Sequence, residues 1–372
     1  MKKILTATVA SLTLMTGVAH ADKYQATTWL APSHILTSVG YVPFLADVKA
    51  ATKGKIDFEL YSSGSLVPAQ TTLGALGDNV AQLGLVATSY TPSELPISGL
   101  INDLAFVAQN DMATAFALTE TVLTNKRIQA EFAKHGTVAL AGYSTPTYLM
   151  LCMRDVRDLN DVKGLKIRTA GTAQNEWVAS LGAVPVAVTA ADVYSGLERG
   201  SIDCTLTDPT SLETGLKLWE VVKTITMLEQ GTSLGVTYVY NKDFWSDIGP
   251  ENRRKLLDVT ARSVARVQIA YSQAVSKALK GSKERGLKIN EPDASLVQAL
   301  AKFRAGVVDS YPSRTAKERR VQDPTDVAKQ FLELQSKWTK LLEGIDVNNE
   351  DAVAKLVADE IFSKVDEKSF GL

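Results

Sequence analysis

Residues 158–168 read DLNDVKGLKIR, and the chain continues with GAVPV at 182–186 and DVYSGLERGSID at 192–203. The apolar end of the first segment, Leu165 to Arg168, is a strand candidate. Thr189 and Asp192 form a capping box, whose side chains can satisfy free backbone N–H groups at a helix start. The helix that begins there ends at Gly200. A strand-like run followed by a helix-like run favours an α/β fold.

The same alternation extends outward from this stretch, from Tyr24 to about Tyr240. Thr114 to His135 carries a helical pattern that Gly136 stops. Further strand candidates are Ile56–Tyr61, Leu83–Ala87, Val138–Ala141 and Tyr148–Met153. The sequence therefore predicts an α/β protein, and its 372 residues suffice for two domains.

One helical pattern is long enough to cross from one domain to another. It starts at Pro250, a residue favoured in the first turn of a helix, and runs to about Lys280. About 30 residues at 1.5 Å each give a rod of roughly 45 Å. Beyond about Asn290 the chain is helical and charged, with an amphipathic pattern from Thr325 to Leu342. Two interpretations of this tail stay open: packing helices with a solvated face, or the interface of a homodimer.

Composition excludes several classes of protein. Basic and acidic residues nearly balance, 40 against 41, whereas a nucleic-acid-binding domain is strongly basic. Apolar residues make up 45% of the chain, which excludes a disordered or collagen-like protein. Three His and two Cys leave little material for a metal site, so we expect no metal and no cofactor.

The first 21 residues resemble a secretory signal peptide. Lys2 and Lys3 precede a mostly apolar run from Ile4 to Met15, and Ala19-His20-Ala21 is a small-x-small cleavage site. The apolar run is shorter than the ~20 residues that span a bilayer. We therefore expect export to the periplasm with cleavage after Ala21.

Catalytic signatures are missing from the sequence. It contains no G-x-S-x-G, H-E-x-x-H, P-loop or G-x-G-x-x-G motif. Beyond the leader the only histidines are His34 and His135. His34 follows the first strand, where ligand-binding loops of open α/β sheets emerge. The sequence thus predicts a protein that is not an enzyme.

Cys152 and Cys204 are the only cysteines of the chain. In an oxidising compartment such a pair favours a disulfide, although two separate buried thiols remain an alternative.

The three segments quoted first, taken together, resemble the periplasmic solute-binding subunits of tripartite ATP-independent periplasmic (TRAP) transporters, the DctP-like family. The family pattern reads D-L-K-G-L-K-I-R, then G-A-x-P-V, then E-x-Y-x-A-L-Q-x-G-x-V-D. Thr52–Ile56, Gly64–Leu66 and Trp245 with Pro250-Glu251 also match, so the resemblance covers roughly Tyr24 to Lys280.

The resemblance implies two α/β lobes that close over a ligand, with long helices crossing between them. It places one discontinuous lobe at 22–146 and about 234–285. The second lobe then takes about 147–233 and 286–372, including a helical C-terminal extension. It also implies the function: capture of a solute for a membrane permease, without chemistry.

Arg168 matches the family's arginine that grips a ligand carboxylate. A planar guanidinium can donate two parallel hydrogen bonds to a carboxylate, a geometry that Lys cannot reproduce. A small organic acid is therefore the expected ligand.

The sequence departs from the family in two places. The family branch that binds sialic acid and dicarboxylates has a second Arg about 20 residues earlier, where this chain has Thr145-Pro-Thr147-Tyr148. Thr207-Asp208-Pro209 stands where the family often has Asn before Pro. Asp208 is either a turn-forming residue or a partner for an amine or hydroxyl. A zwitterion or amine anchored by Asp208 is thus an alternative ligand, and a secreted two-lobed enzyme or a receptor-coupled sensory module are alternative functions.

The remaining candidates for the ligand cleft are polar or aromatic residues, and aromatic rings can cover an apolar ligand. They are Trp29, His34, Gln70, Ser89, Tyr90, Tyr148, Thr207 and Ser233. Among them, Gln70 stands where the family often places a polar contact after its G-x-L motif.

Overall fold

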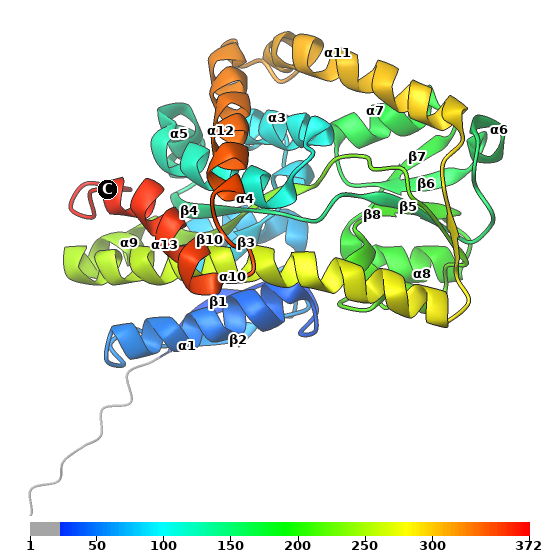
Figure 1. The fold of residues 1–372 in the computed structure, drawn as a ribbon. Coiled ribbons are helices and arrows are strands. Elements are labelled where there is room, and N and C mark those ends of the chain that lie inside the picture. The colour runs from blue at the N-terminus through cyan, green and yellow to red at the C-terminus, as the bar shows by residue number, and fades with distance from the viewer. Residues whose placement is uncertain (1–22) are drawn as a thin grey trace, which may run out of the picture.

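The computed structural model describes residues 23–372, and the signal-peptide segment with its cleavage site lies outside the described residues. Two sheets separate the molecule into two lobes (Figure 1). The first sheet has the order β2 (Phe58–Tyr61), β1 (Tyr24–Thr27), β3 (Leu83–Val86), β10 (Leu234–Asn241) and β4 (Thr137–Ser144). The second has the order β11 (Lys288–Asn290), β9 (Thr224–Thr226), β5 (Leu149–Cys152), β8 (Cys204–Thr207), β6 (Lys166–Thr169) and β7 (Val184–Ala187). The expected two-lobed α/β fold is confirmed.

Each sheet is mixed, with both parallel and antiparallel strand pairs. In the first sheet β1 pairs in parallel with β2 and β3, while β10 runs antiparallel to β3 and β4. In the second, β6 is parallel to β7 and β8, and β5 is antiparallel to β8 and β9. The chain passes from β4 into β5 and returns from β9 to β10, so both lobes are discontinuous.

Helices cover both sheets, as parallel strands with crossover connections require. In the first lobe they are α1 (Val42–Ala51), α2 (Thr72–Gly77), α3 (Pro96–Leu104), α4 (Asp111–Thr124), α5 (Lys126–Lys134) and α9 (Lys242–Asp247). In the second they are α6 (Leu159–Val162), α7 (Thr172–Ser180) and α8 (Val193–Glu198). The expected helix over Thr114–His135 is divided at Asn125, whose side chain accepts from the N–H groups of Arg127 and Ile128 and so caps α5.

The predicted long helix is α10 (Gly249–Glu284), 36 residues that span about 54 Å. It packs on α1 and β4 of the first lobe and reaches β11 of the second, as Figure 1 shows. Its buried face includes Leu256, Val264, Val267 and Tyr271. The helix therefore crosses between the lobes as expected.

The C-terminal helices correct the predicted lobe boundary. After β11 the chain forms α11 (Ala294–Glu318), α12 (Thr325–Glu343) and α13 (Glu350–Glu360). α12 packs on α4, and α13 packs on α10 beside the first lobe. Trp338 of α12 is fully buried, contacts Phe116 and donates to Glu120 at 2.7 Å. The assignment of all of 286–372 to the second lobe is therefore wrong for α12 and α13, because their apolar faces find their partners on the first lobe.

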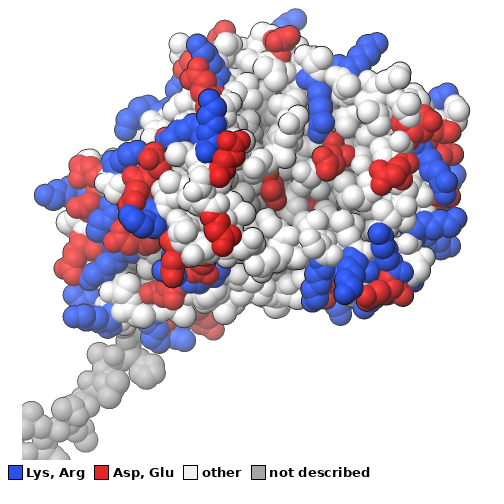
Figure 2. Space-filling view, viewed as in Figure 1, with Lys and Arg blue, Asp and Glu red and all other residues white. Residues whose placement is uncertain are grey.

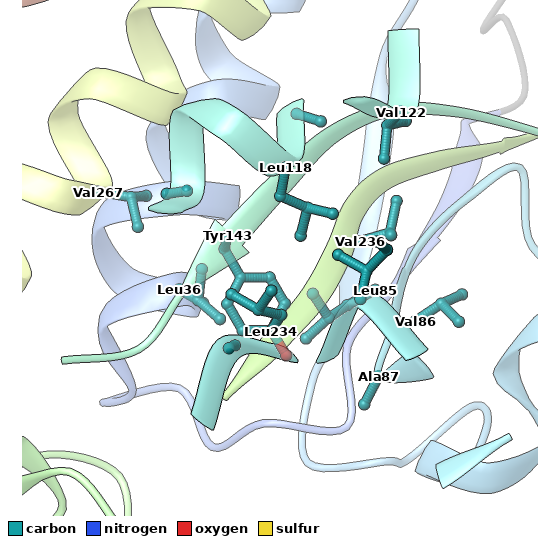
Figure 3. Close-up of a cluster of buried hydrophobic side chains, with 14 of the residues drawn as sticks. Leu36, Leu85, Val86, Ala87, Leu118, Val122, Tyr143, Leu234, Val236 and Val267 are labelled. Atoms are coloured by element: carbon teal, nitrogen blue, oxygen red, sulfur yellow. The ribbon is translucent and has the colours of Figure 1, made fainter. Parts of the chain in front are cut away.

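The core of the first lobe lies between its sheet and the helices above it. Figure 3 shows Leu85, Leu118, Tyr143 and Val236 converging from β3, α4, β4 and β10. Val267 of α10 is part of the same cluster, so the crossing helix shares this core. On the face seen in Figure 2, basic and acidic side chains intermingle, as the balanced composition predicts.

Candidate functional site

A cavity of about 340 Å³ lies between the two lobes. Its walls come from loops that follow β1 and β3, from β4, from the end of β8, and from Tyr271 within α10. A second hollow, of about 440 Å³, lies where the C-terminal tail meets α4 and α5 of the first lobe alone. The inter-lobe cavity is the candidate site, because ligand pockets of open α/β sheets occur at the carboxyl ends of strands and between domains.

Eight of the ten predicted ligand-binding residues line this cavity: Trp29, His34, Ser89, Tyr90, Tyr148, Thr207, Asp208 and Ser233. Gln70 lies in the short helix η2 (Ala69–Thr71) with an exposed side chain and is outside the cavity lining. Arg168 lies behind the lining, where β6 ends. The structure thus brings together most of the predicted residues and separates Gln70 from them.

Arg168 is only 1% exposed and is held by the strand ends around it. Its Nε donates to the carbonyl of Val188 at 3.0 Å, and Nη1 donates to the carbonyl of Leu206 at 3.2 Å. Nη2 donates to the hydroxyl of Tyr90 at 3.2 Å. None of the ion pairs among residues 23–372 involves Arg168. Because a buried cation needs an anion to offset its desolvation, this arginine is suited to bind one.

Tyr90 joins the two lobes at the cavity. It ends the short helix η3 (Thr88–Tyr90), directly after β3 of the first lobe. Besides the bond from Arg168, its hydroxyl oxygen accepts from the backbone N–H of Ala190 at 3.1 Å. Both donors belong to the second lobe. The ring packs against Trp29, with centroids 5.6 Å apart.

Asp208 has the first of the two roles weighed from the sequence, that of a turn-forming residue. It is the N-cap of the short helix η6 (Pro209–Leu212), where its Oδ1 accepts from the N–H of Thr210 at 3.0 Å and from the Thr210 hydroxyl. It is also 4% exposed and lines the cavity. Burial raises the pKa of Asp208 to about 6, since desolvation disfavours the charged carboxylate.

His34 lines the cavity rim as a neutral ring. Burial lowers the pKa of His34 to about 4. The N–H of Leu36 donates to its Nδ1 at 3.2 Å, so the neutral ring carries its proton on Nε2. The ring lies against Gly215 of the second lobe, whose N–H donates to the Ser33 hydroxyl at 3.3 Å. This loop therefore closes the cavity from the first-lobe side.

Three further tyrosines, which were not predicted from the sequence, also line the cavity: Tyr143, Tyr194 and Tyr271. Tyr194 lies within the segment 192–203 that matches the family pattern, and Tyr271 lies among the buried residues of α10. With Trp29, Tyr90 and Tyr148 they make the walls rich in aromatic side chains. Burial raises the pKa of Tyr148 to about 12, while Arg168 opposes that rise. A cavity of this kind fits a compact ligand with an apolar or ring-shaped body.

A second set of contacts joins the lobes away from the cavity. Asp103 of α3 is 2% exposed and pairs at 2.7 Å with Arg319, the C-cap residue of α11. Its Oδ1 also accepts from the N–H of Ala173 at 3.0 Å, in the first turn of α7. Arg319 further donates to the Thr172 hydroxyl at 3.2 Å. One carboxylate of the first lobe thus caps a helix of the second lobe.

Cys152 and Cys204 form a disulfide, as predicted. They face each other in the antiparallel pair β5–β8. The disulfide lies at one end of this pair, and Tyr148 and Thr207 lie at the opposite end, next to the cavity. Within residues 23–372 no cluster of His, Cys, Asp and Glu could hold a metal ion. No helix in the same range is long and apolar enough to cross a membrane.

Comparison with known proteins gives one family match. The family model "bacterial extracellular solute-binding protein, family 7", DctP, matches residues 27–312. A solute-binding protein of Albidiferax ferrireducens is 23% identical over 183 residues, which are 49% of this chain and 53% of that relative. The C4-dicarboxylate-binding periplasmic protein DctP of Rhodobacter capsulatus is 27% identical over 242 residues, 63% of this chain and 70% of the relative.

One solved structure with a similar fold is a TRAP solute-binding protein from Rhodoferax ferrireducens T118 in complex with copurified benzoate. The TM-score is 0.76 at 20% identity, and the match covers 87% of this chain and all of the other.

Proposed function

The chain belongs to bacterial extracellular solute-binding protein family 7, and we propose that it captures a small monocarboxylate whose carboxylate Arg168 grips. The family consists of binding proteins, so no chemistry is expected at the site. We further propose that the captured acid is delivered in the periplasm to a TRAP membrane permease, after the segment before residue 22 has been removed.

One observation carries this proposal: a buried arginine that no carboxylate of the described chain neutralises, placed directly behind a cavity between the lobes. Three of its five N–H groups are engaged by neutral oxygens, which leaves two free donors. A carboxylate accepts such donors bidentately. In a closed cavity of low dielectric the interaction strengthens further.

The cavity walls support a ring-shaped or compact acid. The volume of about 340 Å³ lies at the small end of ligand pockets, and six aromatic side chains line it together with His34. Within the described residues Arg168 is the one buried guanidinium next to the cavity, so a single carboxylate is favoured over a dicarboxylate. The benzoate bound to the neighbour of similar fold is a ligand of this chemistry.

The test is a thermal-shift and calorimetric titration of the mature protein with matched ligands. Benzoate, mandelate and pyroglutamate supply the carboxylate, benzamide replaces it by a neutral isostere, and benzylamine reverses the charge. A ligand at 100-fold excess over its Kd stabilises the native state by about 2.7 kcal/mol. We expect a shift with at least one acid, none with benzamide, and loss of that shift in Arg168→Ala.

Arg168→Lys separates charge from geometry, because it keeps the charge but loses the bidentate fork. Arg199→Ala is the matched control, since Arg199 is exposed and bonds only within its own helix turn. A shift with benzylamine that survives Arg168→Ala and is lost in Asp208→Asn would replace this proposal by the amine alternative.

A further inference from the structure

The hydroxyl group of Tyr90 makes two hydrogen bonds that both cross from one lobe to the other. Arg168 Nη2 and the backbone N of Ala190 lie 3.2 and 3.1 Å from the Tyr90 oxygen. Both groups are obligatory donors, so the phenol oxygen must accept both bonds. Tyr90 is half-buried and belongs to the first lobe, whereas both donors belong to the second.

The donors and acceptors of Tyr90 and Arg168 can be counted to find those that have no partner. A phenol has one O–H and an oxygen that accepts in about two directions, and both directions are used here. The O–H is then free only to donate, and the described residues provide no acceptor for it. Two N–H groups of Arg168 are also left, as counted above. Three donors are thus left on Tyr90 and Arg168, beside the cavity that Tyr90 lines.

An acceptor-only anion matches this set of donors. A carboxylate offers about four lone-pair sites on two oxygens and donates nothing when ionised. If it accepts from the Tyr90 O–H, it fixes the hydroxyl rotor, and the phenol lone pairs then face Arg168 and Ala190. Hydrogen bonds arranged in such a chain strengthen one another.

We propose that Tyr90 is a positioning residue that couples carboxylate binding to closure of the lobes. Its O–H donates to the ligand carboxylate, while its oxygen accepts from Arg168 and from the N–H of Ala190, at the start of η5 (Ala190–Asp192) and α8. The proposal rests on the proposed function, because the carboxylate completes the chain of bonds. Trp29 fixes the ring from the first-lobe side, at a centroid distance of 5.6 Å.

The decisive variant is Tyr90→Phe, which keeps the ring and its packing on Trp29 and removes only the oxygen. The probe is whichever of benzoate, mandelate and pyroglutamate stabilises the wild type most. Stopped-flow fluorescence gives the association and dissociation rates, and small-angle scattering gives the radius of gyration with and without the acid. Hydrogen exchange reports on the Ala190 amide. Tyr240→Phe is the matched control, since it removes a buried tyrosine hydroxyl that has no partner and lies outside the cavity lining.

We expect Tyr90→Phe to weaken binding at least 10-fold, which is the size of one charge-assisted hydrogen bond. The loss should lie in faster dissociation, with the association rate changed by less than about threefold. The acid-induced decrease in radius of gyration and the protection of the Ala190 amide should both diminish, while Tyr240→Phe should behave as wild type.

The proposal is overturned if Tyr90→Phe closes and dissociates like the wild type, or if its loss of affinity lies wholly in association. It is also overturned if the variant loses affinity but keeps acid-induced closure and Ala190 protection, because Tyr90 would then be a simple ligand contact. Failure of all three acids to bind the wild type is a separate result, which refutes the proposed function itself and removes the basis of the coupling.

Discussion

Arg319 and Asp103 form an ion pair of 2.7 Å across the junction of the lobes, with side chains 14% and 2% exposed. The family match ends at residue 312, so Arg319 lies in the C-terminal part that the family model does not cover. The same guanidinium bonds the carbonyl of Pro96 and the Thr172 hydroxyl, which belong to different lobes. Burial raises the pKa of Asp103, and Arg319 is the main group that opposes this rise. The C-terminal extension thus contributes a buried charge to the inter-lobe junction.

Removing Arg319 should therefore destabilise the whole protein. Arg319→Ala leaves the buried carboxylate of Asp103 without its cation, a change that typically costs 3–5 kcal/mol, so we expect about that loss in free energy of unfolding. Urea titration measures it. Arg262→Ala is the control, since Arg262 pairs with Glu350 and Asp351 at the surface, where such pairs contribute about 0–1 kcal/mol. A similarly small loss for both variants would show that Asp103 is satisfied without Arg319.

The disulfide should stabilise the second lobe without taking part in binding. Cys152 and Cys204 are 52 residues apart, and closing a loop of that length restricts the unfolded chain by about 4 kcal/mol in the entropy model. We expect the double variant Cys152→Ser/Cys204→Ser to lose roughly that much in free energy of unfolding and to keep the affinity for its acid. Unfolding of the wild type in reductant provides the comparison. An affinity loss of 10-fold or more in the folded double variant would place the bridge within the binding machinery.

Stability should also depend on pH through Asp208. Its pKa is raised to about 6, against about 3.9 in an unfolded chain, so the native state holds the proton more tightly. The free energy of unfolding therefore falls as pH rises from about 4 to about 6, by about 3 kcal/mol from this residue. Asp208→Asn keeps an oxygen to accept from Thr210 and removes the titration.

The difference in unfolding free energy between Asp208→Asn and wild type should accordingly rise by about 3 kcal/mol in favour of the variant over this pH interval. Urea titrations at half-unit steps from pH 4 to 7 measure it. Taking the difference cancels the contributions of other titrating groups, among them His34, whose lowered pKa acts in the opposite direction. A difference that stays constant over the interval would mean that Asp208 titrates as an ordinary carboxyl.

The features of the sequence that predicted the fold correctly are local patterns. Alternation of strand-like and helix-like runs predicted the α/β class, and the uninterrupted apolar stripe after Pro250 predicted α10 to within about four residues at its end. The capping role of Asn125 was missed because the apolar pattern continues on both sides of it, so only the cap separates α4 from α5. Helix caps of this kind are visible in a sequence only when the pattern around them also breaks.

The partners of the C-terminal helices could not be predicted, because an amphipathic stripe shows that a face is buried and not what buries it. The amphipathic pattern of Thr325–Leu342 indicated an apolar face, and the structure packs that face, with Phe331 and Trp338 buried, on α4 of the first lobe. The site shows the same limit. Tyr271 has the spacing of a core residue and also faces the cavity, while Gln70 matched a family position and lies outside it.

Closure of the rim depends on a residue without a side chain. Gly215 has φ +76° and lies so close to His34 that an added Cβ would be 3.0 Å from its Cδ2. Gly200 has φ +67° with nothing within 4 Å of the added Cβ, so it shares the backbone penalty and lacks the contact. Alanine at either position costs about 1–2 kcal/mol of stability through the left-handed conformation. Only Gly215→Ala additionally pushes the two lobes apart at the rim.

We therefore expect similar melting temperatures for ligand-free Gly215→Ala and Gly200→Ala, but at least a 10-fold weaker affinity for Gly215→Ala alone. Calorimetric titration of both variants with the acid that binds the wild type decides this, and equal affinities would show that the rim can stay apart while the ligand is held.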